Sequence, residues 1–467
     1  MVLTPPERSR QTCPREKIRM ATCGYKKRSD FSILTATFKS SISTHNKMSS
    51  SQHIIESHDI YHGLPTFKEE GLTAIVTGAN GISGTYMLKV LGQHPQRWKK
   101  IYALSRRPPY GDLPKNVEHI PCDFLESPEE ISSKLKAKGV KGDYAFFFAY
   151  IQPAPKEGQG IWANAEELIS VNKSLLSSFL EALTISKTIP KAVLLQLGGK
   201  YYGVHLGPGT PPYEETASRV EFEPNFYYTQ EDYLKEWARK NGTNWVTTRP
   251  SLIPGAVPDN AMNFVLPLAI YATVQKHLGL PLEFPSDLRA WEMTTSISSA
   301  QTNAYLSEWA VLTHSAHNES FNACDDSAFT WAQLWPRLAA RFGIEWKGPD
   351  LEADFMEITM PYVPPPRGWG PNATLKFKFT LTEWAKKPEI QKAWKEIADA
   401  NGLKMTGFAD VDRLFGFTDG TFGFSYPLLY SMTKAKEMGY FGYVDSTKSI
   451  IKTVEEFADL KMIPKLP

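Results

Sequence analysis

The sequence has few cysteines, little net charge and no long apolar run. None of its four cysteines stands at a spacing typical of metal ligands, so neither a metal site nor a disulfide framework is expected, and a reducing compartment is favoured. The net charge is only +2, which indicates no preference for nucleic acid. The longest apolar stretch, residues 144–151, is far shorter than the roughly 20 residues that cross a bilayer, so no membrane span is expected.

The N-terminal leader, residues 1–47, carries the basic surplus of the chain, with ten Lys or Arg against three acidic residues. A composition rich in Ser, Thr, Lys and Arg and poor in acids is typical of a mitochondrial transit peptide. However, the leader lacks a convincing apolar helix that bears arginines, and Met48 is an acceptable start for the folded part. We therefore favour a disordered extension or a misassigned start, and a cytoplasmic location, with a mitochondrial location as the alternative.

Beyond residue 70, short apolar strands alternate with helical segments. This alternation predicts an α/β fold, a Rossmann-type doubly wound parallel sheet covered by helices on both faces. We expect a strand, a glycine turn and the opening of a helix over 72–84, and further strands at 101–107, 117–124, 144–151, 191–199 and 244–250. The long segment 163–183 carries apolar residues at helical spacing.

The alternation weakens after Pro254, which favours a smaller, mostly helical C-terminal cap that binds substrate. Within it, residues 346–379 are expected to form loops and short helices. Phenylalanines of the cap either wall a pocket or belong to ordinary core, and core is favoured. The predicted division is a poorly ordered leader and arm (1–67), a dinucleotide-binding Rossmann domain (68–254) and a substrate-binding region with segments that return to the Rossmann core (255–467).

Three glycines, Gly78, Gly81 and Gly84, follow the first strand and open a helix. Glycine lets the backbone turn tightly and approach a pyrophosphate, and the helix N-terminus offers its amides to the negative charge. Alone the triplet is a weak signal, but a strand before it and a second strand shortly after it make the signal strong. We therefore expect a dinucleotide at this turn.

The residues at the end of the second strand indicate which of the two nicotinamide cofactors is bound. An acidic residue there would bind the ribose hydroxyls of NAD, but the chain reads Ser105, Arg106 and Arg107. Two guanidinium groups and a hydroxyl suit the 2′-phosphate of NADPH, although a solvated basic turn is the plainer alternative. Asp123, after the third strand, can accept from the adenine amino group or simply stabilise a turn.

A reductase of this kind needs a hydrogen-bond donor beside the substrate carbonyl. Tyr227 or Tyr228 can serve if a nearby cation lowers the pKa of the phenol, and spacing alone does not choose between them. The usual lysine four residues later is absent, because Glu231 and Asp232 stand there. The cation must come from elsewhere, and Lys200, just after the fifth strand, is expected at the ligand-binding edge of the sheet.

Four blocks carry a resemblance to a known family: TGANGISG, SRRP, LQLGGKYYG and NFYYTQED. They resemble the progesterone 5β-reductase and iridoid synthase-like (PRISE) family of extended short-chain dehydrogenases, and the likeness covers about residues 70–465. The resemblance implies NADPH-dependent 1,4-reduction of an enone or enal, with Tyr227 and Lys200 as the catalytic pair. It also implies cofactor contacts from Tyr227 and from Asn80, Gly81, Ile82, Arg106, Arg107, Asp123, Phe124, Ala149, Gln196 and Ile253.

The chain departs from the family pattern at two places. Tyr201 replaces the histidine that usually follows the motif lysine, and Ala149 and Tyr150 replace a hydroxyl residue and a tryptophan. The expected substrate is therefore a small hydrophobic carbonyl compound of unspecified structure, and the sequence allows a homodimer without determining it. Cyclisation or direct carbonyl reduction, an NAD-dependent epimerase or dehydratase, and a non-catalytic dinucleotide sensor remain as alternatives.

Overall fold

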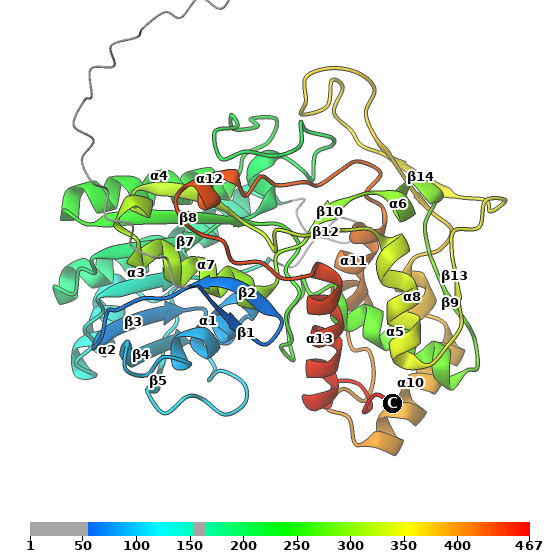
Figure 1. Ribbon diagram of the computed structural model, residues 1–467, viewed down its shortest axis with the longest axis horizontal. Coiled ribbons are helices and arrows are strands. Elements are labelled where there is room, and N and C mark those ends of the chain that lie inside the picture. The colour runs from blue at the N-terminus through cyan, green and yellow to red at the C-terminus, as the bar shows by residue number, and fades with distance from the viewer. Residues whose placement is uncertain (1–54, 154–163) are drawn as a thin grey trace, which may run out of the picture. The chain divides into compact units, whose positions relative to one another are not determined.

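Seven parallel strands form the central sheet of the computed structural model, which describes residues 55–153 and 164–467 (Figure 1). In spatial order the strands are β5 (Val117–Pro121), β4 (Trp98–Ser105), β3 (Leu72–Thr77), β6 (Tyr144–Phe147), β7 (Ala192–Gln196), β8 (Asn244–Pro250) and β11 (Glu319–Ala323). The predicted doubly wound sheet is confirmed. Because the winding reverses between β3 and β6, a crevice is expected at the carboxyl ends of these two strands.

Two differences from the expected strands bear on the site. The strand predicted over 144–151 ends at Phe147, because the next residues leave the sheet and the amide of Phe148 donates to Thr77 Oγ1 at 3.1 Å. The seventh strand, β11, was not predicted. This strand begins nearly seventy residues after the end of β8, the strand with which it pairs, so local alternation gave no signal for it.

Helices cover both faces of the sheet. On one face lie α2 (Pro128–Ala137), α3 (Ala165–Ser186) and α4 (Phe226–Asn241), and on the other lie α1 (Ile82–Gly92) and α7 (Ala300–Leu312) (Figure 1). Within the described residues, α3 alone is long and apolar enough to cross a membrane. However, it packs between α2 and α4 and buries Leu176, Phe179 and Leu180, as a core helix does.

A second hydrophobic cluster lies in the C-terminal part of the chain, around fully buried Trp335 and Trp394. It is enclosed by α5 (Val265–His277), α8 (Trp331–Phe342), α10 (Pro388–Asn401), α11 (Val411–Phe422) and α13 (Ser446–Asp459) (Figure 1). The cap phenylalanines Phe408, Phe415 and Phe422 are buried in this cluster. They are therefore core residues.

Short elements complete the chain. They are β9 (Leu282–Glu283), α6 (Leu288–Glu292), β10 (Thr295–Ser296), β12 (Ala328–Phe329), β13 (Trp346–Lys347), β14 (Met356–Thr359), β15 (Thr374–Phe377), α9 (Leu381–Ala385), α12 (Thr433–Glu437) and the 3-10 turns η1 (Gly199–Tyr202) and η2 (His314–Ala316). The expectation of short helices over 346–379 was wrong, since β14 and β15 pair as antiparallel strands there.

An antiparallel hairpin, β1 (Ile55–His58) and β2 (Tyr61–Pro65), precedes the sheet. The amide and carbonyl of His62 bond to the carbonyl and amide of Tyr443, so a C-terminal segment holds the hairpin. Regular structure therefore begins within the segment 1–67 that the sequence assigned to a poorly ordered leader and arm. The leader, 1–47, lies outside the described residues.

Candidate nucleotide-binding and catalytic site

The glycine turn after β3 packs directly on the loop that follows β6. Gly78 has a φ of +62°, and a Cβ on it would lie 2.7 Å from the carbonyl carbon of Phe148. A Cβ on Gly84 would lie 2.3 Å from the carbonyl oxygen of Gly78. Both positions therefore require glycine. The N-cap of α1, Gly81, has no side-chain cap, so the amides of the first helical turn are available to an anionic ligand.

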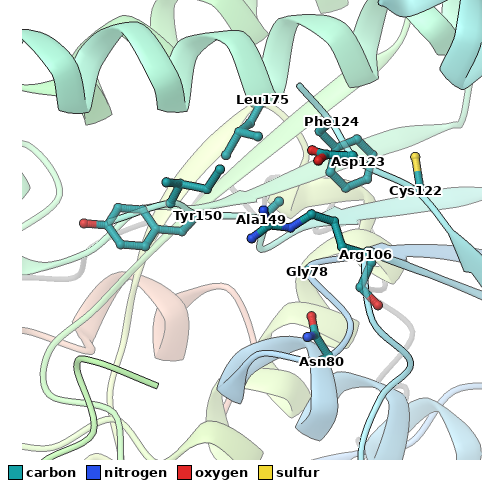
Figure 2. Close-up of a pocket in the computed structure, with 11 residues that line it drawn as sticks. Gly78, Asn80, Arg106, Cys122, Asp123, Phe124, Ala149, Tyr150 and Leu175 are labelled. Atoms are coloured by element: carbon teal, nitrogen blue, oxygen red, sulfur yellow. The ribbon is translucent and has the colours of Figure 1, made fainter. Parts of the chain in front are cut away.

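A cavity that is open to solvent lies beside this turn at the carboxyl ends of β3, β4, β5 and β6 (Figure 2). Its lining includes seven of the predicted nucleotide-site residues: Gly78, Asn80, Ser105, Arg106, Asp123, Phe124 and Ala149. Figure 2 shows the Arg106 side chain reaching across the cavity toward Ala149 and Tyr150. The structure thus brings together residues from four separate strand ends.

The sequence missed four lining residues, namely Cys122, Tyr150, Ile151 and Leu175. Ile151 is held in place by Asn172 of α3, whose amide donates to the Ile151 carbonyl and accepts from its amide, both at 3.0 Å. A buried asparagine on the apolar face of α3 was the signal that could have identified this contact.

The remaining predicted cofactor residues lie at the same edge of the sheet but outside the cavity lining. Gly81 and Ile82 belong to the start of α1, and Ile253 follows β8, partly buried against the core. Gln196, at the end of β7, donates from Nε2 to Ser83 Oγ at 2.8 Å. This bond ties β7 to the first turn of α1.

The two arginines after β4 have different surroundings. Arg106 lines the cavity, whereas Arg107 pairs with Asp259, with Nη2 and Oδ2 3.2 Å apart. Asp259 also accepts from Arg413 at 2.6 Å. Burial raises the pKa of Asp259, but the bonds from Arg413 and Arg107 outweigh it and hold that pKa below its ordinary value. Only Arg106 faces the cavity directly.

Ser105 and Asp123 stabilise the strand ends from which they come. The Ser105 hydroxyl donates to the carbonyl of Arg107 at 2.7 Å, and Asp123 Oδ1 accepts from the amide of Leu125 at 3.0 Å. Both residues also line the cavity. The alternatives of turn stabilisation and nucleotide contact are therefore not exclusive at Asp123.

The tyrosine pair opens α4, and the two hydroxyls have different partners. Tyr228 Oη donates to the carbonyl of Tyr201 at 2.6 Å and accepts from the amide of Val220 at 2.9 Å. The hydroxyl of Tyr227 lies against Gly198, where a Cβ would be 2.8 Å from it, and no described residue makes a hydrogen bond to it. Burial raises the pKa of Tyr227, which is opposite to the lowering we expected.

Lys200 lies in η1, two residues beyond Gly198. Its carbonyl accepts from Asn225 Nδ2 at 2.8 Å, and its Nζ lies 6.0 Å from the ring centroid of Phe226. Burial lowers the pKa of Lys200 to about 8, and Glu223 opposes that shift. The turn that carries Lys200 and the helix start that carries Tyr227 are therefore in direct contact.

Glu231, four residues after Tyr227, belongs to a buried ion network. Its side chain is only 1% exposed and pairs with Arg219 at 2.8 Å, Arg249 at 3.3 Å and Lys235 at 3.5 Å. Burial raises the pKa of Glu231, but these cations outweigh it and hold that pKa below its ordinary value. The position of the usual lysine therefore has a structural role in this chain.

The fold and site are those of an oxidoreductase of the extended short-chain dehydrogenase type. The features that define this class are the glycine turn at the start of α1, the seven-stranded parallel sheet and the tyrosine beside a lysine-bearing turn. The PRISE-like Rossmann-fold domain family matches residues 74–358, and the chain belongs to this family. The resemblance inferred from the sequence is confirmed.

Several curated relatives align over most of the chain. A short chain dehydrogenase of Penicillium aethiopicum is 32% identical over 84% of this chain and 99% of its own length. A 3-oxo-Delta(4,5)-steroid 5-beta-reductase of Arabidopsis thaliana is 32% identical over 84% of this chain and 93% of its own length. An uncharacterized protein of Schizosaccharomyces pombe is 33% identical over 85% of this chain and 99% of its own length.

Among solved structures, an epimerase from Methanothermobacter thermautotrophicus superposes with a TM-score of 0.52 at 16% identity. The alignment covers 84% of this chain and 93% of the epimerase. At this identity the similarity shows a shared fold, and function must be argued from the site.

Proposed function

We propose that the protein is an NADPH-dependent reductase that performs 1,4-reduction of an activated C=C bond in a small enone or enal. The observation that carries the proposal is the position of the Tyr227 hydroxyl, which lies against Gly198 and bonds to no described residue. This hydroxyl lies at the same edge of the sheet as the cavity and close to the turn that carries Lys200. A donor in this position can hold a carbonyl oxygen as negative charge develops on it.

The surroundings of the cavity fit NADPH. The turn at Gly78 and Gly84 excludes side chains where a pyrophosphate would approach, and the start of α1 leaves its amides available. Arg106 would hold a 2′-phosphate, and no acidic residue stands at the end of β4 to bind a ribose diol instead. When bound, NADPH would supply the hydride for the reaction.

The protonation state of Tyr227 favours reduction of the C=C bond over reduction of the carbonyl. Burial raises its pKa, so the phenol stays protonated and donates a hydrogen bond rather than a proton. An enolate oxygen needs only such a bond, because the final proton goes to the α-carbon. Direct reduction of a carbonyl requires full protonation of its oxygen. The printed name of the Arabidopsis relative, which describes a 3-oxo-Delta(4,5)-steroid reductase, agrees with the same reaction class.

The test is oxidation of NADPH, followed by absorbance, with a panel of small enones and enals and with NADH in parallel. We expect turnover selective for NADPH and a saturated carbonyl product, identified by mass spectrometry. Tyr227→Phe is the matched control and should bind NADPH without turnover. An allylic alcohol product would mean direct carbonyl reduction. Retention of NAD through purification would support an epimerase, and NADPH binding without turnover on any substrate would support a sensor.

A further inference from the structure

The backbone turn that carries Lys200 is held by side chains from two distant parts of the chain. Tyr228 of α4 donates to the carbonyl of Tyr201, and Tyr426 donates to the carbonyl of Val204 at 2.7 Å. Asn225 donates to the carbonyl of Lys200 itself at 2.8 Å. Three carbonyls within five residues are thus fixed by side-chain donors.

Asn225 differs from the two tyrosines because it uses both ends of its amide. Its Oδ1 accepts from the amide of Tyr227 at 3.0 Å and so caps α4, while its Nδ2 binds the Lys200 carbonyl. The residue is buried, 9% exposed, so water cannot easily replace either bond. One rigid amide group therefore connects the backbone of the lysine to the backbone of the tyrosine.

We propose that Asn225 is a positioning residue that sets the separation of Lys200 and Tyr227, an inference that rests on the proposed function of this pair. Lysine has a long, flexible side chain, so its ammonium group is placed only as well as its backbone is fixed. A displacement of about 1 Å at a reacting group can cost on the order of 100-fold in rate. The bond between Asn225 and Lys200 restrains the turn against such a displacement.

Two substitutions separate the roles of Asn225. Asn225→Ser keeps an oxygen that can cap α4, but its shorter side chain cannot reach the Lys200 carbonyl. Asn225→Ala removes both bonds. Thr330→Ala is the matched control, because Thr330 caps a different helix, α8, by accepting from the Gln333 amide at 3.2 Å.

Each variant is measured in three ways: by thermal unfolding, by kcat and KM for NADPH with an enal, and by acetylation of Lys200 as a function of pH, read by mass spectrometry without cofactor. For Asn225→Ser we expect a lower unfolding temperature, because the buried Lys200 carbonyl loses its partner, together with a nearly unchanged KM. We also expect a kcat lower by roughly tenfold and an acetylation midpoint moved upward because the amine becomes more solvated. Thr330→Ala should lower the unfolding temperature alone.

The inference is overturned if Asn225→Ser leaves both the acetylation profile of Lys200 and kcat unchanged. It is also overturned if Asn225→Ala resembles Thr330→Ala and loses only stability. The acetylation profile requires no turnover. If the wild-type protein reduces none of the tested enones or enals, the proposed function fails, while the placement of Lys200 by Asn225 is still tested.

Discussion

The hydroxyl of Tyr228 lies 2.6 Å from the carbonyl oxygen of Tyr201 and also accepts a bond from the amide of Val220. Its donor and an acceptor site are therefore both used inside the protein. The neighbouring Tyr227 has no such bonds from any described residue. Sequence spacing left the two tyrosines equivalent, but its hydrogen bonds give Tyr228 a structural role. This difference supports our proposal that Tyr227 is the tyrosine that faces the substrate.

The first prediction separates the two tyrosines. Tyr227→Phe should lower kcat by about 100-fold or more while thermal stability stays within experimental error, because the lost hydroxyl supports only the reaction. Tyr228→Phe should destabilise the protein by about 1–3 kcal/mol, since it leaves two backbone groups without partners, and should affect kcat less. Steady-state kinetics and urea unfolding measure both. The opposite ranking would assign the catalytic hydroxyl to Tyr228.

The second prediction concerns the two arginines after β4. Arg106→Ala should raise the Kd for NADPH by roughly 10- to 100-fold and leave the Kd for NADH nearly unchanged, because it removes a charged bond to the 2′-phosphate. Arg107→Ala should have a smaller effect, since Arg107 already pairs with Asp259. Fluorescence titration with both cofactors provides the measurement. Equal losses for NADPH and NADH in Arg106→Ala would contradict the assignment of a phosphate site.

The third prediction is a pH dependence set by Lys200. Its pKa is lowered to about 8 by burial, so the folded protein releases this proton at a lower pH than the unfolded chain, where the value is 10.5. Between these values the unfolded state binds more protons, and the contribution of Lys200 to stability rises with pH. Activity should change in the opposite direction, because the ammonium group is lost as the pH rises through 8.

The measurement is kcat from pH 6 to pH 10 for the wild-type protein and for Lys200→Arg. Above its midpoint the wild-type kcat should fall by about tenfold per pH unit, as expected for the loss of one essential proton. Lys200→Arg keeps its charge throughout this range and should give a lower but flatter profile. If both proteins show the same fall, another group is responsible.

The sequence predicted the parts of the fold and site that depend on local pattern. The glycine turn, six of the seven strands and the cavity residues Gly78, Ser105, Arg106 and Asp123 follow from local patterns. The other three predicted cavity residues were implied only by the family resemblance: Asn80, Phe124 and Ala149. The strand β11 depends on long-range pairing with β8, which no local period reveals. The pairing of Arg107 with Asp259 is also a long-range contact, because the two residues are 152 positions apart in the sequence.

The last prediction concerns the acid in the position of the usual lysine. Glu231→Gln should destabilise the protein by about 3–5 kcal/mol, because it leaves Arg249, whose side chain is 3% exposed, with an uncompensated buried charge. Asp232→Asn is the control: Asp232 also pairs with Arg219, but it is 61% exposed, so its loss should cost about 1 kcal/mol or less. Urea unfolding at pH 7 measures both.

Glu231→Lys extends the same test. A lysine four residues after Tyr227 matches the usual motif, yet here it would place a fourth cation beside Arg219, Arg249 and Lys235. We expect this variant to fail to fold, because like charges that share a buried site cannot all be solvated. A stable, active Glu231→Lys protein would show that the ion network is dispensable.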